Sequence, residues 1–266
     1  MRIAQIAPLH EAVPPRLYGG TERVVSYLTE ALVAEGHEVT LFASGDSVTS
    51  ARLEPVWPQA LRLSPALSDV IVPHILLMEA ARRQADRFDI MHFHVDYWPF
   101  SLFSRQRTPF VTTLHGRLDH PELQPLFDMF PHVPIVSISD AQRRPLQARY
   151  VATVQHGLPT NLLTPQGLDP QYLAFLGRIA PEKGLHKAIR IARACGIPLK
   201  IAAKVDKVDQ AYFDAIIRPM LADGGLELIG EINEAQKPDF LSGALALLMP
   251  IDWPEPFGLV MIEAGL

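Results

Sequence analysis

Short, continuously apolar runs alternate with longer amphipathic segments along most of this sequence. The runs in the first half are "RIAQIA" (2–7), "EVTLFAS" (38–44), "DIMHFH" (89–94), "FVTTLH" (110–115), "IVSIS" (135–139) and "ATVQHG" (152–157). Strands that are apolar on both faces are typical of a parallel sheet that helices cover on both sides. The pattern therefore predicts an α/β fold.

The segment between the first two runs predicts a helix. In "TERVVSYLTEALVAEG" the apolar residues recur at helical spacing on one face. Thr21 is in place to be the N-cap, and Gly36 to follow the C-terminal end. A strand, a helix and a second strand in this order indicate a βαβ unit.

The same alternation restarts after residue 170. It predicts strands at 172–179, 199–205, 226–232 and 244–251, and helices at 184–196, 210–224 and 233–243. The segment 156–170 is rich in Pro, Gly and Asn, so we predict a domain boundary there, with domains at 1–165 and 166–266. The second domain is the shorter one, and we expect it to be incomplete at its C-terminal end.

Composition excludes several classes of protein. The formal charge of −5 argues against a nucleic-acid partner, and the single Cys195 excludes an internal disulfide. No signal peptide precedes the first apolar run. The apolar stretch 70–81 contains Pro73 and is shorter than the ~18 residues of a membrane span. We expect a soluble, cytoplasmic protein; contact with a membrane surface stays open, without support in the sequence.

Two turns between a strand and a helix predict anion sites. Gly19 and Gly20 in "LYGGTE" would let backbone N–H groups approach a negatively charged ligand. In "GRIAPEKG", Arg178 and Lys183 are in place to converge on one diphosphate. The alternatives are a flexible glycine turn and a loop of solvated surface charges.

The closing stretch "DWPEPFGLVMIEAGL" contains Glu255 and Glu263. If both are helical they share a face, and Pro256 at the first helical position puts Glu255 near the N-cap. Carboxylates so placed commonly accept hydrogen bonds from vicinal sugar hydroxyls. The alternative is a capping carboxylate followed by an exposed helical glutamate.

The set "YGGTE", "GRIAPEKG" and "EPFGLVMIEA" resembles the retaining glycosyltransferases of family 4, which have the GT-B fold. The resemblance implies two Rossmann-like, doubly wound domains facing a cleft. It also implies that the C-terminal domain holds a nucleoside-diphosphate sugar and the N-terminal domain a saccharide or lipid-linked acceptor.

The resemblance assigns roles to individual residues. Arg178 and Lys183 would hold the donor diphosphate and stabilise it as the leaving group, and Glu255 would contact the transferred sugar. His115 in "TTLHG" matches a family histidine near the donor sugar. The remaining donor contacts would come from the amides of Gly19, Gly20, Phe257, Gly258 and Leu259, from Glu263 at the ribose, and from Glu231 near the base.

The family requires no cofactor and no metal. His92 and His94 share a strand face, which is one way to hold a metal, but strand-end histidines more often line a cleft or bond the backbone. Two alternatives to transfer stay open: a module that binds the nucleotide sugar without turnover, and an epimerase of the same fold, against which the "EPFGLVMIEA" match argues. A hydrolase using Glu255 and Asp252 would leave Arg178 and Lys183 unexplained. The identities of the donor and the acceptor cannot be read from the sequence.

Overall fold

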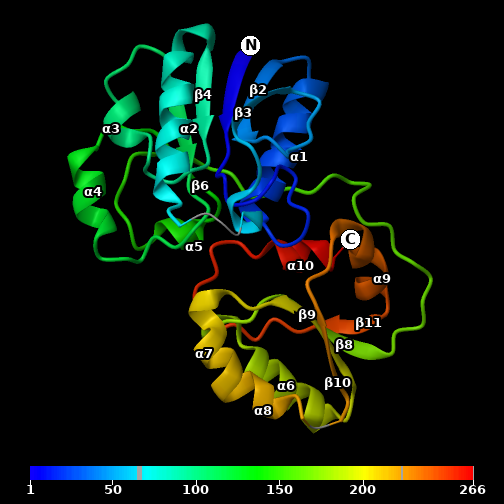
Figure 1. Ribbon diagram of the computed structural model, residues 1–266. Helices are drawn as coiled ribbons and strands as arrows, with labels where there is room; N and C mark the ends of the chain where they lie inside the picture. The colour runs from blue at the N-terminus through cyan, green and yellow to red at the C-terminus, as the bar shows by residue number, and fades with distance from the viewer. Residues whose placement is uncertain (65–67, 223, 266) are drawn as a thin grey trace. The chain divides into compact units, whose positions relative to one another are not determined.

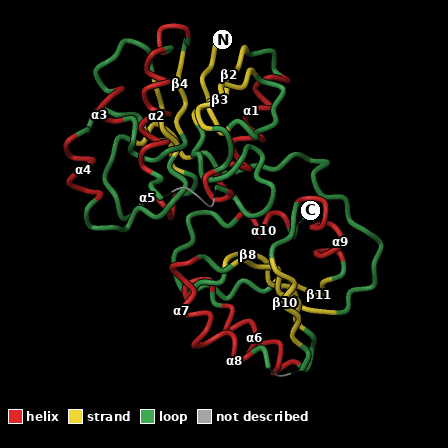
Figure 2. Tube along the Cα trace, in the orientation of Figure 1, coloured by secondary structure: helices red, strands yellow, loops and turns green. Residues whose placement is uncertain are grey.

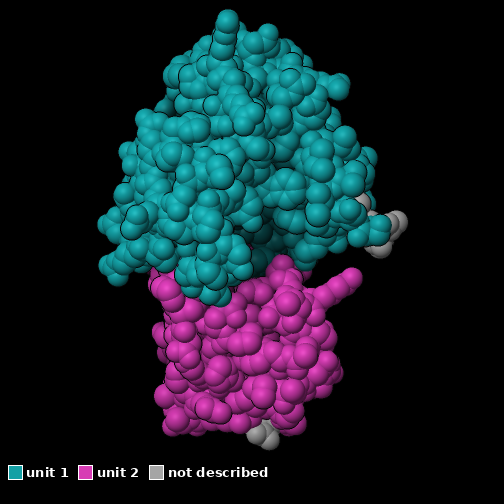
Figure 3. All heavy atoms as spheres, turned by 90° about the vertical axis from the view of Figure 1, so that its left-hand side faces the viewer, with its two compact units in different colours: residues 1–157 teal, residues 158–266 magenta. Residues whose placement is uncertain are grey.

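The computed structural model describes residues 1–64, 68–222 and 224–265. It divides into two compact units, residues 1–157 (unit 1) and 158–266 (unit 2), which Figure 3 draws in different colours. The division falls inside the segment 156–170, which the sequence analysis identified as the junction. Each unit has its own sheet, and every pairing between strands in both sheets is parallel among the described residues.

Unit 1 contains a seven-stranded sheet in the order β3-β2-β1-β4-β5-β6-β7. Figures 1 and 2 label its strands β2, β3 and β4. Its strands are β1 Arg2–Ile6, β2 Glu38–Ser44, β3 Arg52–Trp57, β4 Ile90–Phe93, β5 Phe110–Thr113, β6 Ile135–Ser137 and β7 Tyr150–Thr153. The six predicted strands are present, and β3 is an addition. Its sequence "RLEPVW" includes Pro55, which a strand tolerates because β3 lies at the edge of the sheet and pairs on one side only.

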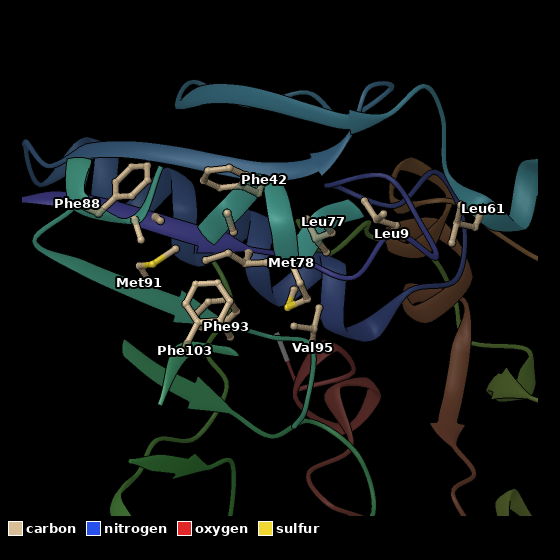
Figure 4. Close-up of a cluster of buried hydrophobic side chains, with 14 residues drawn as sticks. Leu9, Phe42, Leu61, Leu77, Met78, Phe88, Met91, Phe93, Val95 and Phe103 are labelled. Carbon is tan, nitrogen blue, oxygen red and sulfur yellow. The ribbon is translucent and has the colours of Figure 1, made fainter. Parts of the chain in front are cut away.

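Helices cover both faces of this sheet. They are α1 Gly20–Ala34, α2 Ile71–Arg83, α3 Phe100–Phe103, α4 Leu123–Met129 and α5 Asp140–Arg143. Phe42 belongs to a buried cluster with Leu77 of α2 (Figure 4), whereas its neighbour Leu41 packs with Val25 of α1. Because successive side chains of a strand point to opposite faces, α1 and α2 lie on opposite sides, which confirms the α/β prediction.

The predicted N-cap of α1 was wrong. The helix begins at Gly20 and the cap is Gly19, whose carbonyl accepts the first helical hydrogen bond from the N–H of Arg23 at 3.2 Å. Thr21 therefore lies inside the first turn and no side chain caps the helix. Gly36 was predicted correctly, since its φ of +84° is the left-handed conformation common after a helix.

Unit 2 contains a four-stranded sheet in the order β10-β9-β8-β11 (Figure 1). The strands are β8 Tyr172–Arg178, β9 Leu199–Lys204, β10 Leu226–Gly230 and β11 Ala244–Leu247, and the helices are α6 Leu185–Cys195, α7 Gln210–Tyr212, α8 Arg218–Met220, α9 Lys237–Ser242 and α10 Leu259–Glu263. Phe175 packs with Ile189 of α6 on one face, and Ala174 packs with Phe240 of α9 on the other.

The helix predicted at 210–224 is formed by α7, a π-helical turn at Phe213–Ile217, and α8. The π turn precedes Pro219, which has no N–H to donate to the preceding turn. The predicted helix also includes residue 223, which lies outside the described residues. In the part of the chain that the structure describes, no helix is both long enough and apolar enough to cross a membrane.

Candidate functional site

Both sheets reverse their order at the first strand of the unit. β1 lies between β2 and β4, and β8 lies between β9 and β11. In open parallel sheets, ligands bind outside the carboxyl ends of the strands at such a reversal. Polar side chains gather at these ends in both units: Gln5, His94 and His115 in unit 1, and Arg178, Lys183 and Glu255 in unit 2.

In unit 2, the loops after β8 and β11 are held against each other. The loop after β8 forms a 3₁₀ turn at Pro181–Lys183 and reaches α6 through Gly184, which has a φ of +73°. A Cβ atom at Gly184 would lie 2.2 Å from the carbonyl oxygen of Pro250, so only glycine fits there. The backbone N–H of Asp252 donates to the carbonyl of Glu182 at 3.1 Å. These contacts fix the backbone on both sides of the predicted donor residues.

The joined loops bring Lys183 and Glu255 together. Lys183 Nζ donates to Glu255 Oε2 at 2.5 Å, and the two side chains are 19% and 14% exposed. Lys183 Nζ also lies 5.1 Å from the centroid of the Trp253 ring, within the range of a cation–π contact. Lys183, predicted to bind the diphosphate, therefore lies directly beside Glu255, predicted to bind the sugar.

Arg178 has a different set of partners. Its guanidinium donates to Asp209 Oδ2 and to Glu182 Oε1, both at 2.5 Å, and its Nε lies 3.9 Å from Asp206 Oδ2. The predicted pair of cations is thus compensated by two separate groups of carboxylates. Their convergence on one diphosphate stays a prediction.

The prediction that Pro256 starts the last helix, with Glu255 near its N-cap, was wrong, so the condition for a shared helical face is not met. Helix α10 begins at Leu259 after Gly258, whose φ of +84° is incompatible with a helix interior, so Glu255 lies in the loop. Glu263 is in the helix and its Oε1 accepts from Lys237 Nζ at 2.5 Å, with exposures of 5% and 7%. Burial of this pair also excludes the alternative of an exposed helical glutamate.

The other predicted donor contacts lie at ends of secondary structure. Gly19 caps α1, and a Cβ atom there would lie 2.7 Å from Pro15 Cβ, so the turn is closely packed. Glu231 follows β10 and is half-buried. The remaining positions are Gly20 at the start of α1 and Phe257, Gly258 and Leu259 at the start of α10. Their roles toward a ligand stay predictions.

In unit 1, His115 belongs to a network of hydrogen-bonded side chains. His115 Nε2 lies 2.9 Å from His94 Nδ1, and His94 Nε2 lies 2.8 Å from Gln5 Oε1. Gln5 Nε2 lies 3.4 Å from His92 Nδ1, and His92 Nε2 lies 2.7 Å from Thr113 Oγ1. The network joins side chains of β1, β4 and β5 with those just beyond their carboxyl ends.

The histidines of this network are neutral near pH 7. Burial lowers the pKa of His92 to about 4 and that of His156, whose ring stacks on His115, to about 4. Burial also lowers the pKa of His94 and of His115 well below the ordinary value, and the neighbouring histidines add to the effect. Neutral rings each have one donor and one acceptor nitrogen, so the network has a direction.

Gln142 holds the backbone on both sides of His115. Its Nε2 donates to the carbonyls of Leu114 and Gly116, each at 2.9 Å, and its Oε1 accepts from the N–H of Ile138 at 2.9 Å. The side chain is 5% exposed. This clamp fixes the position from which the imidazole projects.

Several residues of these sites were not predicted from the sequence, among them Gln5, Gln142, Asp209 and Lys237. Gln5 had a usable signal, since it is the one polar residue inside the apolar run 2–7 after Arg2. The others look like ordinary surface polar residues until the fold brings them to their partners. The sequence analysis expected His92 and His94 to line a cleft or to bond the backbone; the structure shows them bonding side chains. No metal-binding group of three or more His, Cys, Asp or Glu occurs among the described residues.

Comparisons with known proteins follow the same division of the chain. Residues 18–169 match the family model described as Glycosyltransferase Family 4, and residues 164–265 match the model described as Glycosyl transferases group 1. A curated relative, an uncharacterized 42.6 kDa protein in the cps region of Klebsiella pneumoniae, is 29% identical over 114 residues, which are 42% of this chain and 28% of that protein. The match therefore spans well under two thirds of the relative's length.

Solved structures resemble the chain over almost its whole length. AviGT4, a glycosyltransferase involved in avilamycin A biosynthesis, has a TM-score of 0.73 at 24% identity over 99% of this chain and 75% of its own. Sucrose-phosphate synthase from Thermosynechococcus elongatus has a TM-score of 0.77 at 16% identity over 99% and 78%. Anabaena HepE, in complex with UDP and glucose, has a TM-score of 0.72 at 16% identity over 98% and 77%.

At these identities the solved structures show the fold, which is of the GT-B type with a smaller second sheet. The family model at residues 18–169 covers more than half of the 266 residues and matches the part of the chain that contains α1 and the three histidines of the network. The chain belongs to glycosyltransferase family 4.

Proposed function

We propose that this protein transfers a sugar from a nucleoside-diphosphate sugar to an acceptor hydroxyl with retention of anomeric configuration. The observation that carries the proposal is the Lys183–Glu255 pair, with Arg178 on the adjoining strand end, at the β8/β11 reversal of a family 4 chain. Cations there suit a diphosphate, and a carboxylate beside them suits sugar hydroxyls. The complex of HepE with UDP and glucose is consistent with this class of donor.

The reaction needs no group beyond the donor and the acceptor. The acceptor oxygen forms a bond to the anomeric carbon on the face from which the diphosphate leaves. The bond between that carbon and the β-phosphate oxygen breaks, and the acceptor proton passes to the departing phosphate. Lys183 and Arg178 stabilise the negative charge that develops on the diphosphate by exchanging their present carboxylate partners for phosphate oxygens.

Glu255 acts here as a ligand for sugar hydroxyls rather than as a nucleophile. A retaining hydrolase needs two carboxyl groups ~5 Å apart on either side of the bond that breaks. Glu255 is paired with Lys183 at 2.5 Å and Asp252 with Lys187 at 2.9 Å, so each carboxylate has its own cation. This arrangement favours transfer over hydrolysis. A saccharide or a lipid-linked saccharide is the acceptor that we propose.

The test begins with binding and turnover for UDP-, GDP- and ADP-sugars, each with a panel of saccharide acceptors. We expect one nucleoside diphosphate to bind and its sugar to be transferred with retention, as read by NMR of the product. Binding without transfer would support the alternative of a module without turnover. Formation of an epimer or of the free sugar would support the epimerase or the hydrolase.

The site itself is tested by Arg178→Ala and Lys183→Ala. Each variant should weaken binding of the nucleoside diphosphate by about 1.5–3 kcal/mol, the size of a charge-assisted hydrogen bond, while the free nucleoside binds as before. Arg218→Ala is the matched control, because Arg218 is exposed and pairs with Asp214 one helical turn away. Unchanged diphosphate binding in both site variants would disprove the assignment of this loop.

A further inference from the structure

We propose that Gln5 and His94 are positioning residues that fix the imidazole of His115 as the Nε2–H tautomer, so that its Nδ1 accepts a hydrogen bond from a substrate hydroxyl. The contact with substrate rests on the proposed function, whereas the tautomer is a property of unit 1 alone. The inference comes from the order of donors and acceptors along the network.

The direction of the network starts at the Gln5 amide. Its nitrogen faces His92 Nδ1 at 3.4 Å and its oxygen faces His94 Nε2 at 2.8 Å. An amide oxygen only accepts, so His94 carries its proton on Nε2 and its Nδ1 is an acceptor. His115 Nε2, 2.9 Å from that Nδ1, must then be the donor. The Nδ1 of His115 is left as the unprotonated nitrogen.

The opposite orientation of the Gln5 amide would reverse every bond, and the far end of the network decides between the two. His115 Nδ1 is buried and has no hydrogen-bond partner within the described residues. A buried N–H without a partner costs more than a buried lone pair without one, because orphaned donors are the rarer of the two in proteins. The observed orientation leaves a lone pair at Nδ1, whereas the reversed one would leave an unpaired N–H.

The surroundings keep this arrangement neutral and rigid. His94 and Gln5 are 3% and 0% exposed, and burial disfavours a second proton on either histidine. The Gln142 clamp holds the carbonyls of Leu114 and Gly116, on either side of His115. A histidine held in this way presents an acceptor at a fixed point, which suits a ligand that brings an O–H group. An unprotonated Nδ1 could not donate to a carboxylate or a phosphate.

The direct test is NMR of the protein labelled with ¹⁵N-histidine, because the two ring nitrogens of each neutral tautomer have distinct shifts. The wild-type spectrum at pH 7.5 should show His115 as the Nε2–H tautomer. Observation of the Nδ1–H tautomer would overturn the proposal without any variant and whether or not the protein transfers sugar. His115→Gln assigns the signal.

Two variants test whether Gln5 and His94 set the order of donors and acceptors in the network. Gln5→Leu removes the amide, and His94→Phe keeps a ring but removes the acceptor for His115; each should convert the His115 signal to a mixture of tautomers. Thr112→Val is the matched control, because Thr112 lies on β5, is fully buried and has a hydroxyl without a hydrogen-bond partner in the described part of the chain. An unchanged His115 signal in folded Gln5→Leu and His94→Phe would also refute the proposal.

The catalytic consequence is measured as a split between turnover and binding. Gln5→Leu should lower kcat by about tenfold or more, as loss of a general acid–base or orienting contact does, while the Kd for the nucleoside diphosphate stays within about twofold. A mixture of His115 tautomers with unchanged kcat in Gln5→Leu would refute the role toward substrate. Failure of the proposed function itself would instead show as absent transfer in the wild-type protein.

Discussion

In unit 1 the side chains at the carboxyl ends of the central strands are neutral and bond one another, whereas in unit 2 they are charged and form ion pairs. The network of unit 1 runs through His92, Gln5, His94 and His115 without a formal charge near pH 7. In unit 2, Arg178, Lys183 and Lys237 each lie 2.5 Å from a carboxylate. The same place in a doubly wound sheet therefore accommodates two kinds of chemistry.

The neutral network of unit 1 and the ion pairs of unit 2 would respond differently to a bound ligand. Neutral hydrogen bonds of fixed direction hold a side chain in one state, and little changes on binding. Ion pairs compensate cations that would otherwise repel one another, and they can exchange a carboxylate for a phosphate because both are anions. On the two proposals above, unit 1 would present one acceptor atom to the ligand, and unit 2 would exchange a carboxylate for a phosphate.

The largest expected effect comes from the buried ion pair of unit 2. Glu263→Gln removes the carboxylate that lies 2.5 Å from Lys237 Nζ, in a site where the two side chains are 5% and 7% exposed, and leaves Lys237 with the more distant Glu234 carboxylate at 3.8 Å. It should destabilise unit 2 by about 3 kcal/mol. The measurement is hydrogen exchange of residues 158–265.

Glu227→Gln is the control for Glu263→Gln, since Glu227 is 61% exposed and lies 3.6 Å from Lys200. The paired change Lys237→Met with Glu263→Leu should recover most of the stability. Equal exchange in Glu263→Gln and wild type would show that the ionic character of this pair does not matter to the fold.

A smaller effect for each residue is expected from the loss of stability of unit 1 at low pH. His92 and His156 have folded pKa values of about 4 against 6.5 unfolded, so below pH 6.5 the unfolded chain binds more protons and unit 1 loses stability. The loss grows as pH falls toward 4, and at pH 5 it should amount to about 1–2 kcal/mol for each histidine. Hydrogen exchange of residues 1–157 at pH 7 and pH 5 measures it, after correction for the intrinsic rates. Substitution of the exposed His120 by Gln should leave the difference unchanged, and an equally stable unit 1 at both pH values would contradict the neutral network.

The smallest effect tests whether the carboxylates of unit 2 compete with a ligand. Asp209→Asn removes the charge that lies 2.5 Å from Arg178 Nη1, so the guanidinium becomes easier to transfer to a diphosphate. We expect the affinity for the nucleoside diphosphate to rise by about 1 kcal/mol, because the charge-assisted hydrogen bond to Asp209 no longer has to be broken first. Calorimetry at low and moderate salt measures it. Asp214→Asn, which removes the partner of the exposed Arg218, is the control and should change nothing. Weaker binding in Asp209→Asn would mean that Asp209 orients Arg178 rather than competing for it.

The fold could be predicted because its signals are local. Continuous apolar runs predict buried parallel strands, and the Pro-, Gly- and Asn-rich segment 156–170 marks the junction that contains the division into units. β3 was missed because an edge strand needs to pair on one side only, so "RLEPVW" can include charges and Pro55. The extent of α10 was also missed, because Pro256 suggests a helix start while Gly258 determines where the helix begins.

The candidate site could be predicted only in part, because its contacts join residues distant in sequence. The strand-to-helix turn marks Arg178 and Lys183, but nothing local shows that Lys183 reaches Glu255 72 residues later. The Lys237–Glu263 and Gln5–His94 contacts span 26 and 89 residues. Polar residues of this kind have no periodicity, so their partners become visible only when the strands are ordered in the sheet.

The position of β1 in its sheet has a consequence for the protein during its synthesis. Among the described strands of this sheet β1 is made first, yet it lies inside the sheet, and its second neighbour β4 begins only at Ile90. At a synthesis rate of about 5–20 residues per second, one edge of this buried strand waits roughly 5–20 s for its partner. An apolar edge left open invites pairing with other chains. β8 repeats the arrangement in unit 2, where β11 completes it only at residue 244. The risk that an open strand edge pairs with another chain is therefore greatest while this protein is on the ribosome. A chaperone that covers open strand edges would act best at that stage.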